Sequence, residues 1–165
     1  MNNKGFTLVE ILAVIVIIAL LGILITPGIL NVINNSKNAS NEILYSNIRT
    51  SAIEMYEEIE YMKITFNKYT SAGKQTDEVS IIESNSTKYI EINIQTLVNN
   101  GFLSGVSNEG NDNLNSKIVI NSDNKDIGDC LIKVIKTKNN NKVSYEIESI
   151  SDNEICPTTD DLKGD

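Results

Sequence analysis

The sequence reads KGFTLVEILAVIVIIALLGILITPGIL over residues 4–30, and this segment limits what the rest of the chain can be. Residues 6–25 are apolar or small apart from Thr7 and Glu10. A helix of about 20 residues, at about 1.5 Å per residue, matches a hydrocarbon core about 30 Å thick, which predicts a membrane-spanning helix. A carboxylate inside such a run costs up to about 3.5 kcal/mol at the centre of a bilayer, so Glu10 is a candidate functional residue.

Three simpler explanations of this segment compete. A cleaved secretory signal peptide has an apolar core of roughly 7 to 15 residues and a small-residue cleavage site, whereas here the run is longer and Thr26, Pro27 and Gly28 follow it. A single-pass anchor accounts for the length and for the positive charge of Lys4, but it gives Glu10 no role. A buried core helix would be shorter. A membrane helix with a further function is therefore favoured.

The N-terminus resembles that of the type IV prepilin family, which includes type IV pilins and the pseudopilins of type II secretion and DNA-uptake systems. The matching features are a short leader with Lys4 that ends in Gly5, then Phe6, Glu10, and Pro27 after the apolar run. The resemblance implies cleavage by a prepilin peptidase between Gly5 and Phe6, and N-methylation of the new Phe6 amine. It also implies that Phe6, Glu10 and Pro27 serve filament assembly.

The same resemblance implies partners and a location. The partners would be prepilin peptidase, other pilin subunits in a helical filament, the assembly platform of a pilus or secretion system, and the lipid bilayer. Before assembly the chain would cross the cell membrane once, with its globular domain outside the cytoplasm. After assembly it would lie in a pilus, or fimbrium, at the cell surface.

Composition excludes several classes of protein. The chain has 165 residues, a formal net charge of -8 and no histidine. The acidic balance argues against nucleic-acid binding by the globular domain. Without histidine, Ser-His-Asp and Cys-His nucleophilic sites and HExxH zinc sites are excluded. The carboxylate pairs Glu57-Glu58 and Asp160-Asp161 stand in polar surroundings and are expected to be solvated surface charge, so we expect no enzyme and no cofactor.

The expected fold is α+β: a long N-terminal helix, with a transmembrane and a soluble part, packed on a small antiparallel sheet, as in pilins. We expect a prepilin leader over residues 1–5 and a transmembrane assembly helix over residues 6–30. An amphipathic helix should follow over residues 31–62, and after it a globular domain over residues 63–165. About 100 residues suffice for one small domain.

The helix should be disturbed once and then continue. Pro27 and Gly28 both disfavour a helix interior and predict a kink or a melted turn. Beyond them an apolar stripe recurs at spacings of four and three, too briefly for a coiled-coil seam, and should pack on the sheet. The stripe consists of Leu44, Ile48, Ala52, Met55, Ile59 and Met62.

The remaining segments give weaker signals. Residues 70–88 have no clear period and are expected to connect the helix to the sheet. Residues 90–94 alternate as a strand does, and residues 96–103 predict a short helix that Gly101 stops.

Three later segments, residues 117–121, 131–137 and 143–149, alternate as strands and predict an antiparallel meander, with a turn at residues 139–141. The alternation does not decide between two inward faces, one with Ile132 and Val134 and the other with the odd-numbered residues 131, 133 and 135.

Cys130 and Cys156 are the two cysteines of the chain, and the domain that holds them is expected on the oxidising side of the membrane. A disulfide is predicted, with two free thiols as the alternative. Closing a loop of about 27 residues would stabilise the fold by roughly 3.5 kcal/mol in the chain-entropy model. The bridge would tie the C-terminal tail to the start of a strand.

Two loops, residues 108–113 and 123–129, carry the oxygen-bearing side chains that Ca²⁺ prefers. Lys125, however, stands where an EF-hand loop needs an acidic or amide side chain. Plain turns are therefore expected, with no metal site.

Three classes of function remain. The first is a structural subunit, possibly a minor one, of a type IV pilus or pilus-like filament, and a pseudopilin of a type II secretion or DNA-uptake system shares every N-terminal argument for it. The second is a membrane-anchored binding module that does not polymerise. The third is an enzyme displayed on a tether.

Overall fold

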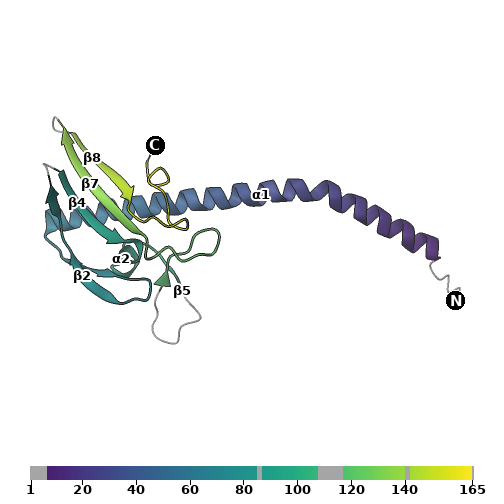
Figure 1. The fold of residues 1–165 in the computed structure, drawn as a ribbon, viewed down its shortest axis with the longest axis horizontal. Coiled ribbons are helices and arrows are strands. Elements are labelled where there is room, and N and C mark those ends of the chain that lie inside the picture. Colours follow the sequence, from purple (N-terminus) through teal and green to yellow (C-terminus); the bar gives the residue numbers. More distant parts are fainter. Residues whose placement is uncertain (1–6, 85–86, 108–116, 140–141, 165) are drawn as a thin grey trace. The chain divides into compact units, whose positions relative to one another are not determined.

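Figure 1 shows the fold as a computed structural model, which describes the backbone of residues 7–84, 87–107, 117–139 and 142–164. The side chains of residues 22–28 lie outside this description. The chain separates into two compact units, Met1–Ala39 and Ser40–Asp165. Helix α1 contributes residues to both units, whereas the described strands belong to the second.

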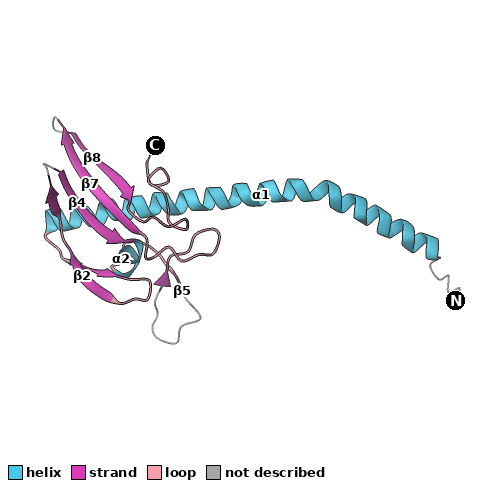
Figure 2. Ribbon diagram, in the orientation of Figure 1, coloured by secondary structure: helices cyan, strands magenta, loops and turns pink. Residues whose placement is uncertain are grey.

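The second unit confirms the predicted α+β class. Its main sheet is antiparallel with strand order β3-β4-β7-β8, of which Figure 2 labels β4, β7 and β8. Two small ribbons pair β1 with β2 and β5 with β6. The elements are α1 (Leu8–Glu57), the π-helical turn η1 (Glu58–Met62), β1 (Phe66–Tyr69), β2 (Gln75–Val79), β3 (Ile82–Ser84), β4 (Thr87–Asn93), α2 (Ile94–Asn99), β5 (Val106–Ser107), β6 (Lys117–Ile118), β7 (Leu131–Asn139) and β8 (Lys142–Ser149).

The core lies between α1 and one face of the main sheet. Ile90 of β4 is paired with Val134 of β7, and Val134 is paired with Ile147 of β8, so that three aliphatic side chains form a row across the sheet. All three are almost fully buried. Burying a large aliphatic side chain completely is worth about 1.5–3 kcal/mol. Because Ile132 is also fully buried, the even-numbered residues of β7 form the inward face that alternation alone left open.

The apolar stripe of α1 is confirmed except at its last member. Met62 is 66% exposed. It is the last residue of η1, and Lys63 then ends the helix in a left-handed conformation with φ 58°. A π-helical turn has more residues than an α-helical one, so the α-helical spacing no longer places Met62 on the buried face. The other stripe residues lie in the core or against it: Leu44, Ile48, Ala52, Met55 and Ile59.

The helix assignment continues through Pro27 and Gly28. The expectation of a melted turn is therefore wrong. The other form of the prediction, a kink at Pro27, stays a prediction.

The expectation of a plain connection over residues 70–88 is wrong, since the β1–β2 ribbon and β3 occupy much of it. Gly73, with φ 72°, donates its N–H to the Thr70 carbonyl (2.8 Å) within the turn that joins β1 to β2. Of the residues of β2, Val79 is buried and the others are exposed. Alternating hydrophobicity arises when one face of a strand is buried, so this exposed ribbon has no such pattern.

The predicted meander is wrong in its first strand. Strand β6 covers Lys117–Ile118 and pairs with β5, and Ile120 makes an isolated bridge with Asp126. The partner of β7 on its other side is β4, in a register that joins Asn93 to Leu131. Alternation identified the strands β7 and β8 but carries no information about which strand lies next to which. Residues 140–141 of the predicted turn lie outside the described residues.

The short helix α2 agrees with the sequence. It ends at Asn99, and Gly101 takes φ 87°, a conformation that glycine adopts most readily. The N–H groups of Phe102 and Leu103 both donate to the Leu97 carbonyl, which closes the helix end. Gly101 therefore stops the helix as predicted.

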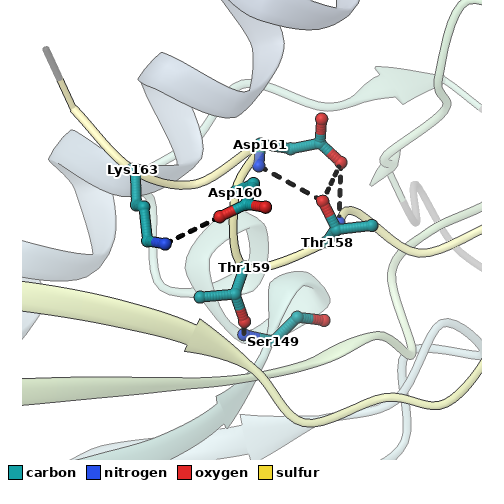
Figure 3. Close-up of polar contacts among 6 residues, drawn as sticks. All are labelled: Ser149, Thr158, Thr159, Asp160, Asp161 and Lys163. Carbon is teal, nitrogen blue, oxygen red and sulfur yellow. Dashed lines mark hydrogen bonds and ion pairs between the residues drawn. The ribbon is translucent and has the colours of Figure 1, made fainter.

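The predicted disulfide is present between Cys130 and Cys156. It holds the C-terminal tail beside the start of β7, and Leu162 of this tail is fully buried in the core. Figure 3 shows how the tail is ordered between these two points: the Asp161 carboxylate accepts hydrogen bonds from the N–H and the hydroxyl of Thr158, both at 2.7 Å. The Thr159 hydroxyl accepts from the N–H of Ser149 at the end of β8.

A lysine surrounded by tyrosines joins the end of α1 to the sheet. The Lys136 side chain is 9% exposed and forms an ion pair with Glu60 of η1. Its ammonium donates to the Tyr61 hydroxyl at 2.9 Å and lies 4.6 Å from the centre of that ring. The rings of Tyr145 and Tyr56 are 5.8 and 5.9 Å away. The cluster satisfies a charge that would otherwise be costly to bury.

The same surroundings shift three pKa values upward. Burial alone would lower the pKa of Lys136, but its hydrogen bonds with Glu60 and Tyr61 outweigh burial and raise it. Burial raises the pKa of Tyr56 to about 12 and that of Tyr145 to about 12. A group whose pKa is raised on folding stabilises the fold below its unfolded pKa and loses that contribution as the pH rises towards its folded pKa.

We expect stability to fall between the ordinary tyrosine pKa of 10.0 and about 12. A shift of two units at one tyrosine corresponds to at most about 2.7 kcal/mol. Urea denaturation followed at pH values from about 8 to 12 measures this loss. Tyr56→Phe should show a smaller loss and unchanged or higher stability near neutral pH, because the buried Tyr56 hydroxyl has no hydrogen-bond partner among the described residues. If Tyr56→Phe loses as much stability at alkaline pH as the parent does, Tyr56 is not a source of this loss.

Candidate processing and assembly site

The first unit presents apolar side chains on every side of its helix. The described residues 7–21 are all exposed. Leu8 is 79% exposed and Ile18 is 63% exposed. Apart from Thr7 and Glu10 these residues are apolar. A helix that is apolar all round requires apolar surroundings, whether lipid or other protein. Within the residues that the structure describes, no helix is both long and apolar enough to cross a membrane.

Thr7 and Glu10 close the start of α1 by a reciprocal pair of hydrogen bonds. The backbone N–H of Thr7 donates to Glu10 Oε2 at 2.9 Å, and the Thr7 hydroxyl donates to the same oxygen at 3.0 Å. In return, the backbone N–H of Glu10 lies 3.3 Å from Thr7 Oγ1. This is a capping box, in which a threonine and the acidic residue three places later satisfy N–H groups that have no partner inside the helix.

The capping box gives Glu10 a local role that the sequence analysis missed. The sequence does contain a signal for this role, because Thr7-Leu8-Val9-Glu10 has the Thr-x-x-Glu spacing that is typical of a helix start. A simple membrane anchor could therefore keep Glu10 as a cap. The presence of this carboxylate alone no longer separates an anchor from an assembly subunit.

The geometry nevertheless leaves part of the carboxylate open. Both bonds from Thr7 end on Oε2. Among the described residues nothing is hydrogen-bonded to Oε1. One carboxylate can accept several hydrogen bonds, so Glu10 can cap its own helix and still take a second donor.

The structure does not fully describe the remaining predicted site residues. Gly5 and Phe6 lie outside the described residues, and so does the side chain of Pro27. Their roles in cleavage, methylation and assembly stay predictions.

The carboxylate pairs are held at the surface by structural partners. Glu57 accepts a hydrogen bond from the Tyr145 hydroxyl at 3.1 Å. Asp160, with an 88% exposed side chain, pairs with Lys163, while Asp161 orders the tail turn. These contacts give Glu57, Asp160 and Asp161 structural roles.

The loop at residues 123–129 is organised by local hydrogen bonds. Asn121 Oδ1 accepts from the N–H groups of Asp123 and Lys125, and Asp126 Oδ1 accepts from that of Gly128. Such contacts are typical of Asx turns. The described residues contain no group of three or more His, Cys, Asp or Glu side chains that could hold a metal ion. Residues 108–113, the other loop considered for calcium, lie outside the description.

Residues 1–26 match the family model of the prokaryotic N-terminal methylation motif. This motif is the hallmark of type IV prepilin-like proteins. The N-terminal segment of the chain therefore carries the motif that marks this family. The matched segment includes the Thr7–Glu10 capping box, so the motif coincides with the start of α1. No curated protein and no solved structure is significantly similar to the chain.

The motif implies processing by prepilin peptidase, membrane anchoring before assembly, and assembly with other pilins. It covers residues 1–26 of 165. The motif therefore says nothing about the globular part, and the pilin and pseudopilin roles both remain compatible with it.

Thr7→Val should loosen the first turn of α1, because valine keeps the shape of threonine and cannot form the capping bonds. Loss of such a cap costs about 0.5–2 kcal/mol. Hydrogen exchange of residues 8–11 in lipid bilayers, followed by mass spectrometry, should be faster in the variant. Thr7→Ser, which keeps the hydroxyl, is the control and should exchange like the parent. If Thr7→Val exchanges like Thr7→Ser, the cap contributes nothing at this helix end.

Proposed function

We propose that the chain is a structural subunit of a type IV pilus or pilus-like filament, held in the membrane until it is assembled. The observation that carries the proposal is that a methylation motif overlaps a helical segment, residues 8–21, in which every residue is exposed and every residue except Glu10 is apolar. Such a surface needs lipid before assembly and apolar side chains of other subunits afterwards. A pseudopilin of a secretion or DNA-uptake system has the same requirement and is the alternative.

We further propose that Glu10 pairs with the Phe6 amine of a neighbouring subunit. Cleavage after Gly5 creates that amine, and methylation preserves its charge. Two opposite charges about 4 Å apart attract by about 4 kcal/mol at an effective dielectric constant near 20, which offsets the cost of holding Glu10 in an apolar environment. Because Oε2 serves the cap, the pair would use Oε1, and the helix start need not open during assembly.

The first test concerns maturation. Protein from its native host should begin at Phe6 and carry a methyl group on the amine, because the peptidase acts beside the apolar segment at the cytoplasmic face of the membrane. Intact-mass measurement of the assembled protein checks both changes at once. Assembled material that still contains Met1, or that is cut after residue 25, would contradict the prepilin assignment.

The second test separates the two roles of Glu10. Glu10→Ala should leave membrane insertion intact, while incorporation into filaments falls at least about tenfold. Glu10→Gln keeps an oxygen that can accept the capping bonds but removes the charge, so it should be incorporated as poorly as Glu10→Ala. Thr7→Val keeps the charge and removes the cap, and it should be incorporated better than either.

Mutant and parent subunits are counted by mass spectrometry in the same sheared filament preparation. Equal incorporation of Glu10→Gln and the parent would show that the charge of Glu10 plays no part in assembly. A low value for Thr7→Val with a normal value for Glu10→Gln would assign the requirement to the cap instead.

A further inference from the structure

Asn100 and Gly101 form the sole Asn-Gly pair of the sequence, and they lie immediately after α2. In such a pair the backbone nitrogen of the glycine can attack the side-chain carbonyl of the asparagine, because glycine has no side chain to hinder the approach. The reaction needs the nitrogen to come close to the asparagine Cγ. Whether the pair reacts therefore depends on its conformation.

The fold holds this pair in an unreactive conformation. Asn100 has ψ 2°, which turns the Gly101 nitrogen towards the Asn100 nitrogen and away from the Asn100 side chain. The side-chain amide of Asn100 donates to the carbonyls of Asn67 (2.9 Å) and Thr96 (2.8 Å). The Gly101 N–H donates to the Val98 carbonyl at 3.1 Å. Both reacting groups are thus occupied by hydrogen bonds that close the end of α2.

We propose that Asn100 is a self-deamidation site, which the folded cap of α2 keeps closed and which opening of that cap switches on. In the open state the Gly101 nitrogen bonds to Cγ of Asn100, the amide nitrogen leaves as ammonia, and a five-membered imide forms. Water then opens the imide at either carbonyl and gives aspartate or isoaspartate. The net reaction consumes one water and releases one ammonia, and it needs no other reactant.

The product cannot restore the original cap. The new carboxylate oxygens would face the carbonyl oxygens of Asn67 and Thr96, so two hydrogen bonds are replaced by repulsion. An isoaspartate also lengthens the backbone by one carbon. Because Asn67 belongs to β1, the bond that is lost also joins α2 to the β1–β2 ribbon. The modification would therefore mark, irreversibly, a chain whose α2 region has opened.

The test is peptide mass spectrometry of the full chain incubated folded, and incubated unfolded in urea with a reductant. We expect deamidation of Asn100 at least about tenfold slower in the folded sample, since a reaction that requires local opening is slowed by the opening equilibrium. At intermediate urea its rate should follow the opened fraction, as measured by exchange of the Gly101 amide. Equal rates in the folded and unfolded samples, or no reaction at Asn100 when unfolded, would overturn the proposal.

A pair of variants tests, without global unfolding, whether opening of the α2 cap controls the deamidation of Asn100. Phe102 follows the turn and packs edge-to-face on Phe66, with ring centres 5.1 Å apart. Phe102→Ala should speed both Gly101 exchange and Asn100 deamidation. Val106→Ala, at an exposed position, should change neither. Faster exchange of the Gly101 amide with an unchanged deamidation rate would show that opening of the cap does not control the deamidation of Asn100.

A second pair tests the effect of the product. Asn100→Asp removes the two side-chain donors, and it should unfold at lower urea than the parent. Asn99→Asp is matched in charge and position but keeps the oxygen that accepts from Gln95 Nε2, so its midpoint should stay close to that of the parent. Equal midpoints for the two variants would refute the claim that the modification damages the cap.

Discussion

One helix has to meet two different surroundings, and this constraint governs the rest of the structure. Over residues 8–21 α1 is apolar on all sides except at Glu10, so the side-chain pattern does not select one face for burial. In the second unit the same helix has one apolar stripe, and Ile48, Ala52 and Met55 of that stripe are fully buried. A stripe of this kind requires one partner surface, which the inner face of the sheet supplies. The change in side-chain pattern along α1 therefore separates the part that builds the domain from the part left for lipid or other subunits.

The parts of the fold that could be predicted are those where burial is one-sided. The stripe of α1 and the strands β7 and β8 each bury one face, and each leaves a period of 3.6 or 2 in the sequence. Strand β2 buries Val79 alone and leaves no period, so the sequence did not reveal it. The pairing of β4 with β7 depends on contacts between distant segments, and alternation within a strand cannot encode it. Periodicity therefore predicted the elements that bury one face, and it did not predict which strands lie next to each other.

Of the site, the sequence predicted the motif, and the roles of its individual residues stay predictions. The order Gly5, Phe6 and Glu10 was sufficient to identify the motif that the family model later matched. The local geometry of Glu10 was not predicted, because a charge in an apolar run is also explained by a distant partner. A carboxylate three residues after a threonine has a partner much nearer. Local hydrogen-bonding patterns therefore have to be examined before a long-range role is assigned to a charged residue.

The same Thr-x-x-acid device occurs twice in the chain, and the comparison shows what the local geometry can explain. Asp161 accepts from the N–H and hydroxyl of Thr158, just as Glu10 accepts from those of Thr7. Asp161 lies in a polar surface turn, where water satisfies the rest of its carboxylate at little cost. Glu10 is flanked in the sequence by apolar residues, and both of its capping bonds from Thr7 end on Oε2. The cap explains why an acceptor is present at residue 10, but an amide could also accept these bonds. The cap alone therefore does not determine that residue 10 is charged, and the pair proposed above with the Phe6 amine of a neighbouring subunit would account for the charge.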